Sequence, residues 1–177
     1  MARISIISPC FNEEENVEAC CEAVRALFAP GGPLERYERE HIFSDNCSTD
    51  GTVAILRRLA AADGAVKVIL NARNFGPFRS NFNALRYATG DGILVFLPVD
   101  LQDPPELIPE MVKHWENGIE VVAGARANRE ESWGLRTCRS IFYSIVNRIS
   151  DFDIPEDVGE FQFIDRKVWQ VVVAHQD

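Results

Sequence analysis

Short apolar runs alternate with longer stretches of helical period along the first half of this chain, and this alternation limits the possible folds more than any other feature. Four of the runs have strand length, and they are Ile4–Ser8, His41–Ser44, Val66–Leu70 and Ile93–Leu97. The stretches between them carry apolar residues at helical spacing, near residues 13–28, 52–62 and 81–88. Successive strand–helix units pack as parallel strands with helices above and below the sheet. We therefore predict an α/β fold with a mostly parallel sheet and helices on both faces.

The last part of the chain gives weaker signals. It predicts a helix over residues 104–117, a strand over 121–124, a polar loop over 126–136, a helix over 135–149 and a short strand over 160–164. No linker, repeat or low-complexity segment divides the sequence, and 177 residues is an ordinary length for one domain. We therefore expect a single domain over residues 1–177.

Charge and hydropathy exclude several classes of protein. The chain has 18 basic and 27 acidic residues, a net charge of −9, which disfavours a nucleic-acid partner. The longest apolar run, Ile93–Val99, falls far short of the roughly 20 residues that a membrane-spanning helix needs. The N-terminus lacks a signal-peptide pattern, and the five cysteines form no CxxC pair. These features predict a cytoplasmic protein with reduced thiols.

Polar segments follow each of the four predicted strands, and they are residues 9–16, 45–52, 71–76 and 100–105. Ligands of open parallel sheets bind beyond the carboxyl ends of the strands, so these segments are the candidate site. Neither a GxGxxG pattern after the first strand nor a P-loop pattern occurs. An acidic rim without a glycine loop favours side-chain contacts to base and ribose, with a divalent cation on the phosphates. This pattern is typical of a nucleotide-diphosphate donor site.

The same four segments, in this order, resemble glycosyltransferase family 2, and most of all its dolichol-phosphate mannosyltransferase and bactoprenol glucosyltransferase branch. The segments are Pro9–Glu14, Asp45–Thr52, Arg73–Gly76 and Asp100–Glu106, and the likeness runs from Ile4 to about Val168. The resemblance implies a Rossmann-like GT-A domain and an inverting transfer of a hexose from a nucleotide-diphosphate sugar. It implies a polyprenyl phosphate or a saccharide as acceptor, and a cytoplasmic site with peripheral contact to the inner face of the membrane. The membrane helices that this branch often carries after the domain are expected to be absent.

The resemblance also implies roles for individual residues. The nucleotide-sugar site would comprise Pro9, Phe11, Glu13, Asp45, Asn74, Arg126 and Arg139, with Asp45 on the edge of the base. The ligands of Mg²⁺ or Mn²⁺ would be Asp100, Gln102 and Asp103, and the candidate acid/base carboxylates would be Asp157 and Glu160.

Several of these residues have a plain structural alternative. Pro9 would serve a turn, Phe11 a core contact, Asp45 and Asp103 helix caps, and Asp157 and Glu160 an acidic loop. The arginines would be solvated surface charges. Asp50 is expected to serve the turn before the helix at residue 52, as a cap or turn residue.

One position departs from the family pattern. The family usually has Asp-x-Asp-Leu-Gln in the fourth segment, and here Pro98 stands at its first position. A missing carboxylate predicts weaker or altered cation binding. It also supports a second hypothesis, a nucleotide-binding domain with impaired catalysis or a fragment of a larger membrane-associated assembly. A third hypothesis is a sugar nucleotidyltransferase. Such an enzyme would be expected to have a basic glycine-rich loop after the first strand, whereas residues 10–16 are acidic.

Overall fold

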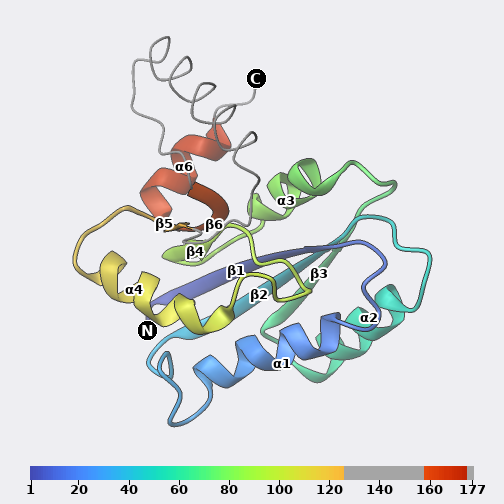
Figure 1. The fold of residues 1–177 in the computed structure, drawn as a ribbon, viewed down its shortest axis with the longest axis horizontal. Helices are drawn as coiled ribbons and strands as arrows, with labels where there is room; N and C mark the ends of the chain where they lie inside the picture. The colour runs from blue at the N-terminus through green and yellow to red at the C-terminus, as the bar shows by residue number, and fades with distance from the viewer. Residues whose placement is uncertain (126–157, 175–177) are drawn as a thin grey trace, which may run out of the picture. The chain divides into compact units, whose positions relative to one another are not determined.

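The computed structural model describes residues 1–125 and 158–174, whose strands form one six-stranded sheet in the order β3-β2-β1-β4-β6-β5 (Figure 1). The strands are β1 (Arg3–Cys10), β2 (Glu38–Asp45), β3 (Val66–Leu70), β4 (Gly92–Leu94), β5 (Val121–Ala125) and β6 (Val158–Asp165). β1 pairs in parallel with β2 and β4, and β2 pairs in parallel with β3. β6 runs antiparallel to β4. The prediction of a mostly parallel sheet is confirmed.

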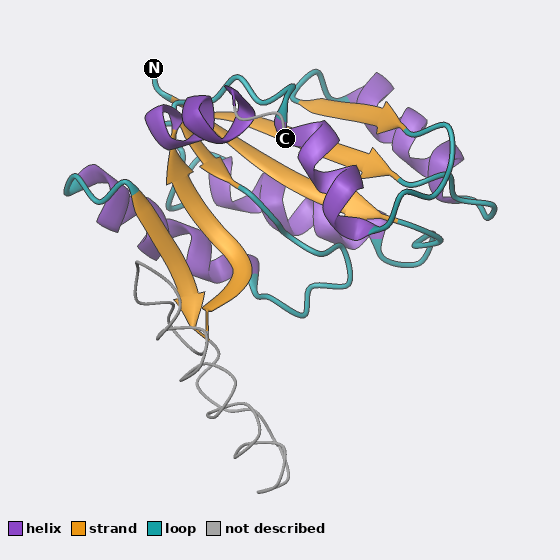
Figure 2. Ribbon diagram, turned by 90° about the horizontal axis from the view of Figure 1, so that it is seen from above, coloured by secondary structure: helices purple, strands orange, loops and turns teal. Residues whose placement is uncertain are grey.

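Helices cover both faces of this sheet, as predicted (Figure 2). They are α1 (Val17–Phe28), α2 (Thr52–Ala62), α3 (Pro77–Leu85), the 3₁₀ turn η1 (Pro105–Leu107), α4 (Ile108–Glu116) and α6 (Arg166–Ala174). The helices α1, α2 and α4 share one hydrophobic core with the sheet, and α3 and α6 share the other.

Neighbouring residues of one strand supply these two cores. In β1, Ile6 packs on the α1 side and Ile7 on the α3 side. In β2, Phe43 and Ile42 divide in the same way. Successive side chains of a strand point to opposite faces, so a strand buried on both faces becomes a continuous apolar run. That is why the parallel strands are visible in the sequence.

Element boundaries differ from the prediction where the chain enters or leaves the candidate site. The first helix begins at Val17 rather than near Glu13, whose carbonyl accepts the amides of Asn16 and Val17. β4 ends at Leu94 instead of Leu97, and α3 begins at Pro77, four residues before the predicted stretch. The helix predicted over residues 104–117 is divided into η1 and α4, and α6 was not predicted.

Contacts divide the chain into two compact units, one of Met1–Val122 with Phe161–Asp177 and one of Ala123–Glu160. The loops that follow β1, β2, β3 and β4 all belong to the first unit. The predicted loop over 126–136 and helix over 135–149 lie outside the described residues. Within residues 1–125 and 158–174, no helix is long and apolar enough to span a membrane.

Candidate active site

A cavity of about 230 Å³ opens where the carboxyl ends of β1, β2 and β4 meet the start of α3. Parallel pairing brings these strand ends to one edge of the sheet, as expected for an open α/β sheet. Five of the predicted site residues line the cavity, and they are Pro9, Phe11, Glu13, Asn74 and Asp100. The other lining residues are Cys10, Asn46, Pro77, Ser80, Phe96, Pro98 and Val99.

The loops around this cavity contain unusual backbone conformations. Among the described residues, positive φ outside glycine occurs at Asn12 (56°), Cys47 (68°) and Leu101 (57°). These residues lie in the loops after β1, β2 and β4, one in each. The left-handed conformation costs a residue with a side chain roughly 1–2 kcal/mol, and such strain gathers at functional sites. The penalty is smaller for Asn12, because asparagine visits this region more readily than Cys47 or Leu101.

Hydrogen bonds tie the loop after β1 to the loop after β2, and we call residues 9–14 and 45–52 the β1/β2 side. The amide of Asn12 donates to Ser48 Oγ at 2.9 Å, and Asn12 Oδ1 accepts the amide of Thr49 at 2.8 Å. The amide of Glu13 donates to Thr52 Oγ1 at 2.8 Å. These bonds hold Asn12 in its left-handed conformation and fix one wall of the cavity.

Asp50 serves the turn, as predicted. Its Oδ1 accepts the amide of Thr52 at 3.0 Å and its Oδ2 accepts the amide of Glu14 at 3.3 Å. Burial raises the pKa of Asp50, but the hydrogen bonds from Thr52 and Glu14 outweigh it and hold the pKa below its usual range. Asp50 is thus an ionised carboxylate committed to backbone donors.

Asp45 is placed differently, with one oxygen in use and the other without a partner. Its Oδ2 accepts the amides of Cys47 at 3.1 Å and Ser48 at 3.0 Å, which closes a local turn. Its Oδ1 is buried and has no hydrogen-bond partner, and the residue is only 1% exposed. Gly51 holds the N-cap position of α2, so Asp45 is not a helix cap. An unsatisfied buried acceptor costs about 1–3 kcal/mol. Asp45 does not line the cavity and adjoins it through its neighbour Asn46, which does.

Pro9 and Phe11 do not have the structural roles that were the alternatives to a place in the site. Pro9 lies within β1, opposite Ser44, and not in a turn. Phe11 is 42% exposed at the cavity, so it is not a core contact. An exposed aromatic ring at the mouth of a cavity offers a stacking surface for a planar ligand. Glu13 lines the same wall, where its Oε2 accepts Asn16 Nδ2 at 2.7 Å.

Asn46 links the β1/β2 side to the loop after β3, and sequence reasoning did not single it out. Its Nδ2 donates to Asn74 Oδ1 at 2.8 Å, and its Oδ1 accepts the amide of Phe75 at 2.9 Å. Ser80, also not predicted, is buried on α3 and bonds Ser44 Oγ at 2.9 Å. A sequence signal for Ser80 existed, because it lies four residues before the buried Ala84 and therefore on the same side of α3.

The fourth wall is the β4 loop, residues 98–103. Asp100 is exposed at the cavity, where its Oδ2 accepts Gln102 Nε2 at 2.7 Å and its Oδ1 accepts the amide of Gln102 at 3.2 Å. Gln102 and Asp103 do not line the cavity. Pro104, not Asp103, holds the N-cap position of η1. The β4 loop therefore offers the cavity one carboxylate, from Asp100.

The donor set limits how a metal would bind. Within the described part of the chain, no cluster of three or more His, Cys, Asp or Glu side chains could hold an ion. Divalent cations such as Mg²⁺ are nevertheless often bound by one or two carboxylates together with substrate phosphates. Asp100 fits a cation that arrives with a diphosphate, and does not fit a permanent metal centre.

Two groups that resemble nucleophiles are excluded by burial. Burial raises the pKa of the Cys10 thiol, and the neighbouring Asp45 carboxylate raises it further, so Cys10 stays protonated. Ser8 Oγ lies 2.9 Å from His41 Nε2, but both residues are fully buried. Burial and the charge of Arg39 lower the pKa of His41 to about 3. This serine–histidine pair belongs to the core.

The remaining predicted residues lie elsewhere in the chain. Arg126, Arg139 and Asp157 are outside the described residues. Glu160 lies in β6, is exposed, and belongs to the second unit.

Comparison with known proteins extends these observations. A family model described as glycosyl transferase family 2 matches residues 5–172. The prophage bactoprenol glucosyl transferase homolog of Escherichia coli (strain K12) is 37% identical over 167 residues, which cover 94% of this chain and 53% of that protein. The bactoprenol glucosyl transferase of Shigella phage SfV is 36% identical, with the same two coverages. The chain thus spans about half the length of these curated relatives.

Two solved structures share the fold. Glucosyl-3-phosphoglycerate synthase from Mycobacterium tuberculosis, in complex with Mn²⁺, UDP and glucosyl-3-phosphoglycerate, superposes with a TM-score of 0.62 and 23% identity, covering 94% of this chain and 58% of that one. Mannosyltransferase PcManGT from Pyrobaculum calidifontis, in complex with GDP-Man and Mn²⁺, gives a TM-score of 0.61 and 18% identity, with coverages of 97% and 46%.

Proposed function

The chain belongs to glycosyltransferase family 2 and has the GT-A fold, and from that premise we propose that it transfers a hexose from a nucleoside-diphosphate sugar to a polyprenyl phosphate. The observation that carries the proposal is the cavity at the strand ends, which combines apolar side chains with a few polar groups. The exposed Asp100 carboxylate lines this cavity from the β4 loop. Asp45 does not line it, but it directly precedes the lining residue Asn46, and its buried Oδ1 has no hydrogen-bond partner.

The base of the donor binds on the β1/β2 side. Asp45 Oδ1 is a pure acceptor, so it would take an N–H from the edge of a base, such as N3–H of uracil or N1–H of guanine. Phe11 supplies the apolar surface for the ring and Glu13 the polar wall beside it. The cavity volume of about 230 Å³ suits a nucleoside rather than a whole nucleotide sugar.

The diphosphate extends toward the β4 loop. Asp100 would hold a Mg²⁺ or Mn²⁺ ion that comes with the donor, with Gln102 and Asp103 as further candidate ligands. When bound, such an ion supplies neutralising charge for the leaving diphosphate. Arg126 and Arg139 add guanidinium donors to phosphate, a role suited to their paired N–H groups.

The transfer itself needs little acid–base help with a phosphate acceptor. A phosphate oxygen attacks the anomeric carbon, the bond from that carbon to the diphosphate oxygen breaks, and the nucleoside diphosphate leaves with the electron pair. In-line attack inverts the configuration of the sugar. A saccharide hydroxyl would instead have to lose a proton, and Asp157 or Glu160 is then the candidate base.

The acceptor and the location follow from the same premise. Relatives named bactoprenol glucosyl transferase favour glucose as the sugar and a membrane-embedded polyprenyl phosphate as acceptor. We place the reaction at the cytoplasmic face of the membrane, where such a phosphate is accessible to a nucleotide sugar.

The test is a transfer assay with the chain, UDP-glucose, Mn²⁺ and a short-chain polyprenyl phosphate, with GDP-mannose as a second donor. We expect a glycosyl phosphate product by mass spectrometry, of opposite anomeric configuration to the donor by NMR. Calorimetric binding of UDP without any product would favour the alternative of a catalytically impaired nucleotide-binding domain, which Pro98 suggests. Failure to bind either nucleotide would contradict both.

A further inference from the structure

The segment between β3 and β4 has a charge opposite to that of the whole chain. Residues 71–90 contain three arginines, three phenylalanines and a tyrosine, and no acidic residue. The chain as a whole carries a net charge of −9. A basic and aromatic stretch in an acidic protein requires an explanation, and the cavity uses only a few of its residues.

The helix α3 gathers these side chains on its outer face. Phe78, Phe82 and Arg86 follow one another at spacings of four, and Arg79 lies beside them, so all four share one side of the helix. Phe78 is 66% exposed and Phe82 is 37% exposed. The opposite side of α3, with Ala84 and Leu85, packs on the sheet.

The loop before α3 continues this surface. Phe75 is 37% exposed, and the guanidinium of Arg73 stacks 4.7 Å from the centroid of its ring. We call Arg73, Phe75, Phe78, Arg79, Phe82 and Arg86 the α3 face.

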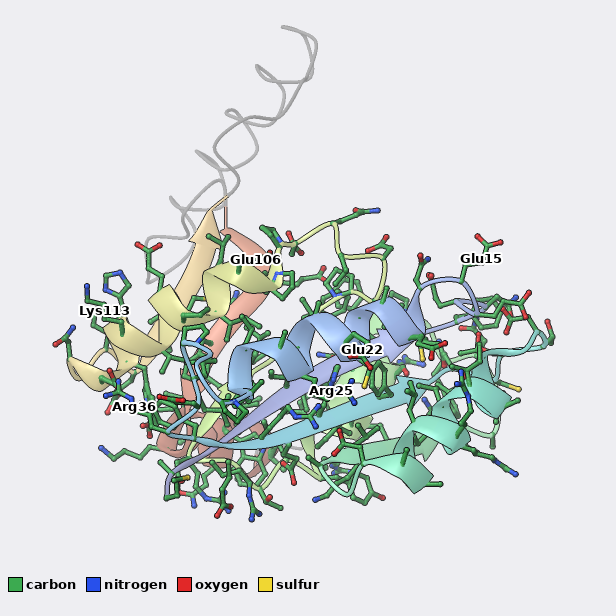
Figure 3. All side chains as sticks on the ribbon, turned by 90° about the horizontal axis from the view of Figure 1, so that it is seen from below. Glu15, Glu22, Arg25, Arg36, Glu106 and Lys113 are labelled. Atoms are coloured by element: carbon green, nitrogen blue, oxygen red, sulfur yellow. The ribbon has the colours of Figure 1, made fainter. Side chains whose placement is uncertain are left out.

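The arginines of the α3 face differ from those on the opposite face of the sheet. On α1, Arg25 pairs with Glu22 at 2.5 Å, and Arg58 of α2 pairs with Glu18 at 2.9 Å. Figure 3 shows Glu22 and Arg25 together on α1. Within the part of the chain that the structure describes, the arginines of the α3 face have no carboxylate partner. Their charge is therefore available to an anionic partner.

We propose that the α3 face docks the protein on an anionic membrane surface. Exposed phenylalanines that alternate with arginines suit the lipid headgroup region, where rings enter the acyl boundary and guanidinium groups meet phosphates. The absence of any acid over residues 71–90 complements an anionic bilayer. The surface is the outer side of a single helix rather than a groove, which suits a flat lipid surface better than a protein segment.

The position of α3 relates the docking to catalysis, and this step rests on the proposed function. Pro77 and Ser80, on the same helix, line the donor cavity. Docking through the outer side of α3 would therefore hold the cavity near the membrane, where the phosphate of a polyprenyl acceptor lies.

The test is co-sedimentation of the chain with vesicles of phosphatidylcholine alone and of phosphatidylcholine with phosphatidylglycerol in a two-to-one ratio. We expect binding to the anionic vesicles that falls with salt, as surface electrostatics requires. The double variant F78S/F82S should bind at least about tenfold more weakly because it loses both inserted rings. R79Q/R86Q should lose about fivefold for each arginine on anionic vesicles.

Matched controls separate this effect from general changes of charge and hydropathy. R25Q/R58Q removes two arginines from the opposite face, and L107S/I119S removes two exposed apolar side chains of other elements. Both controls should bind vesicles like the unmodified chain. Equal binding by the α3-face variants, or no binding by the unmodified chain, would overturn the proposal. A change in self-association instead, by sedimentation velocity, would replace the membrane with a second copy of the chain.

Calorimetry with UDP and Mn²⁺ on the same proteins keeps the two proposals apart. The α3-face variants should retain the nucleotide affinity of the unmodified chain, because none of the substituted residues lines the cavity. Nucleotide binding without vesicle binding would contradict only the docking. Vesicle binding without nucleotide binding would contradict only the proposed function.

Discussion

The β1/β2 side and the β4 loop face the same cavity, but they are built in different ways. On the β1/β2 side, side chains of one loop bond the backbone of the other, and Asp45 is fully buried with one oxygen left over. On the β4 loop, Asp100 is exposed and both of its oxygens accept bonds from its neighbour Gln102. One side is preformed before a ligand arrives. On the β4 loop, Asp100 has to give up a hydrogen bond from Gln102 before it can bind a ligand.

Replacing Asp45 should have the largest effect on the site. Asp45→Asn keeps an oxygen for the amides of Cys47 and Ser48 but turns the unpartnered acceptor into a donor. We expect UDP affinity to fall by about tenfold to a hundredfold, the value of one hydrogen bond to a charged group. Isothermal titration calorimetry measures the loss.

The control for Asp45 is Glu15→Gln, which removes a carboxylate from the same edge of the sheet without touching the cavity (Figure 3). It should leave UDP affinity unchanged. An Asp45→Asn protein with the affinity of the unmodified chain would remove Asp45 from the base site.

Replacing Asp100 should affect binding only when a metal is present. Asp100→Asn is expected to abolish the gain in UDP affinity that Mn²⁺ provides, about tenfold, and to leave metal-free UDP binding unchanged. Titrations with Mn²⁺ and with a chelator measure both values. Glu106→Gln, at the start of η1, is the matched control (Figure 3). A metal effect that survives in Asp100→Asn would exclude the β4 loop as the cation site.

Adding a carboxylate to the β4 loop should make the two sides more alike. Pro98 lines the cavity beside Asp100, so Pro98→Asp places a second carboxylate where the family usually has one. We expect Mn²⁺ to bind several-fold more tightly in the presence of UDP, since a further charged ligand strengthens a divalent site. Pro98→Ala separates the loss of the proline ring from the gain of charge. Equal Mn²⁺ affinity in both variants would contradict this.

Acidification should lower the stability of β2, the strand that leads into the β1/β2 side. We expect no such effect on the β4 loop. His41 lies in β2, four residues before Asp45, and its pKa is lowered to about 3 by burial. The unfolded chain takes up a proton near pH 6.5 while the folded chain does not, so stability is highest above that pH and falls as the pH decreases toward 3. From pH 7 to about pH 5.5 this amounts to about 1 kcal/mol.

Denaturant unfolding at the two pH values measures that loss. His41→Gln should reduce the difference between them, and His114→Gln, on the exposed part of α4, is the matched control for the loss of an imidazole. Equal pH dependence in the His41 variant and the unmodified chain would show that another group is responsible.

The parts of the fold that depend on local pattern were predictable, and those that depend on contacts between distant residues were not. α2 and β3 were predicted with the boundaries that they have, because their apolar periodicity is uninterrupted. β4 ends three residues before its apolar run does, since the amide of Val95 bonds the carbonyl of Gln162 and the amide of Leu97 bonds that of Ile7 as the chain leaves the strand. That change needs the antiparallel β6 beside β4, which no local signal in residues 93–97 indicates.

The candidate site divides in the same way. The segments that contain Phe11 and Asp100 were predicted because parallel strands bring their carboxyl ends to one edge, and the family resemblance singled out these two residues within them. Asn46 and Ser80 were missed because their roles arise from bonds across 28 and 36 positions of sequence. The unpartnered oxygen of Asp45 was equally invisible, since it depends on which oxygen the turn at Cys47 and Ser48 uses.

The most direct test of the site is a crystal structure of the chain with UDP and Mn²⁺. We expect the uracil N3–H within hydrogen-bond distance of Asp45 Oδ1, the ring against Phe11, and Asp100 among the ligands of a cation that also binds the diphosphate. A nucleotide bound at another place, or in the cavity with its base on the β4 loop and its phosphates near Asp45, would contradict it.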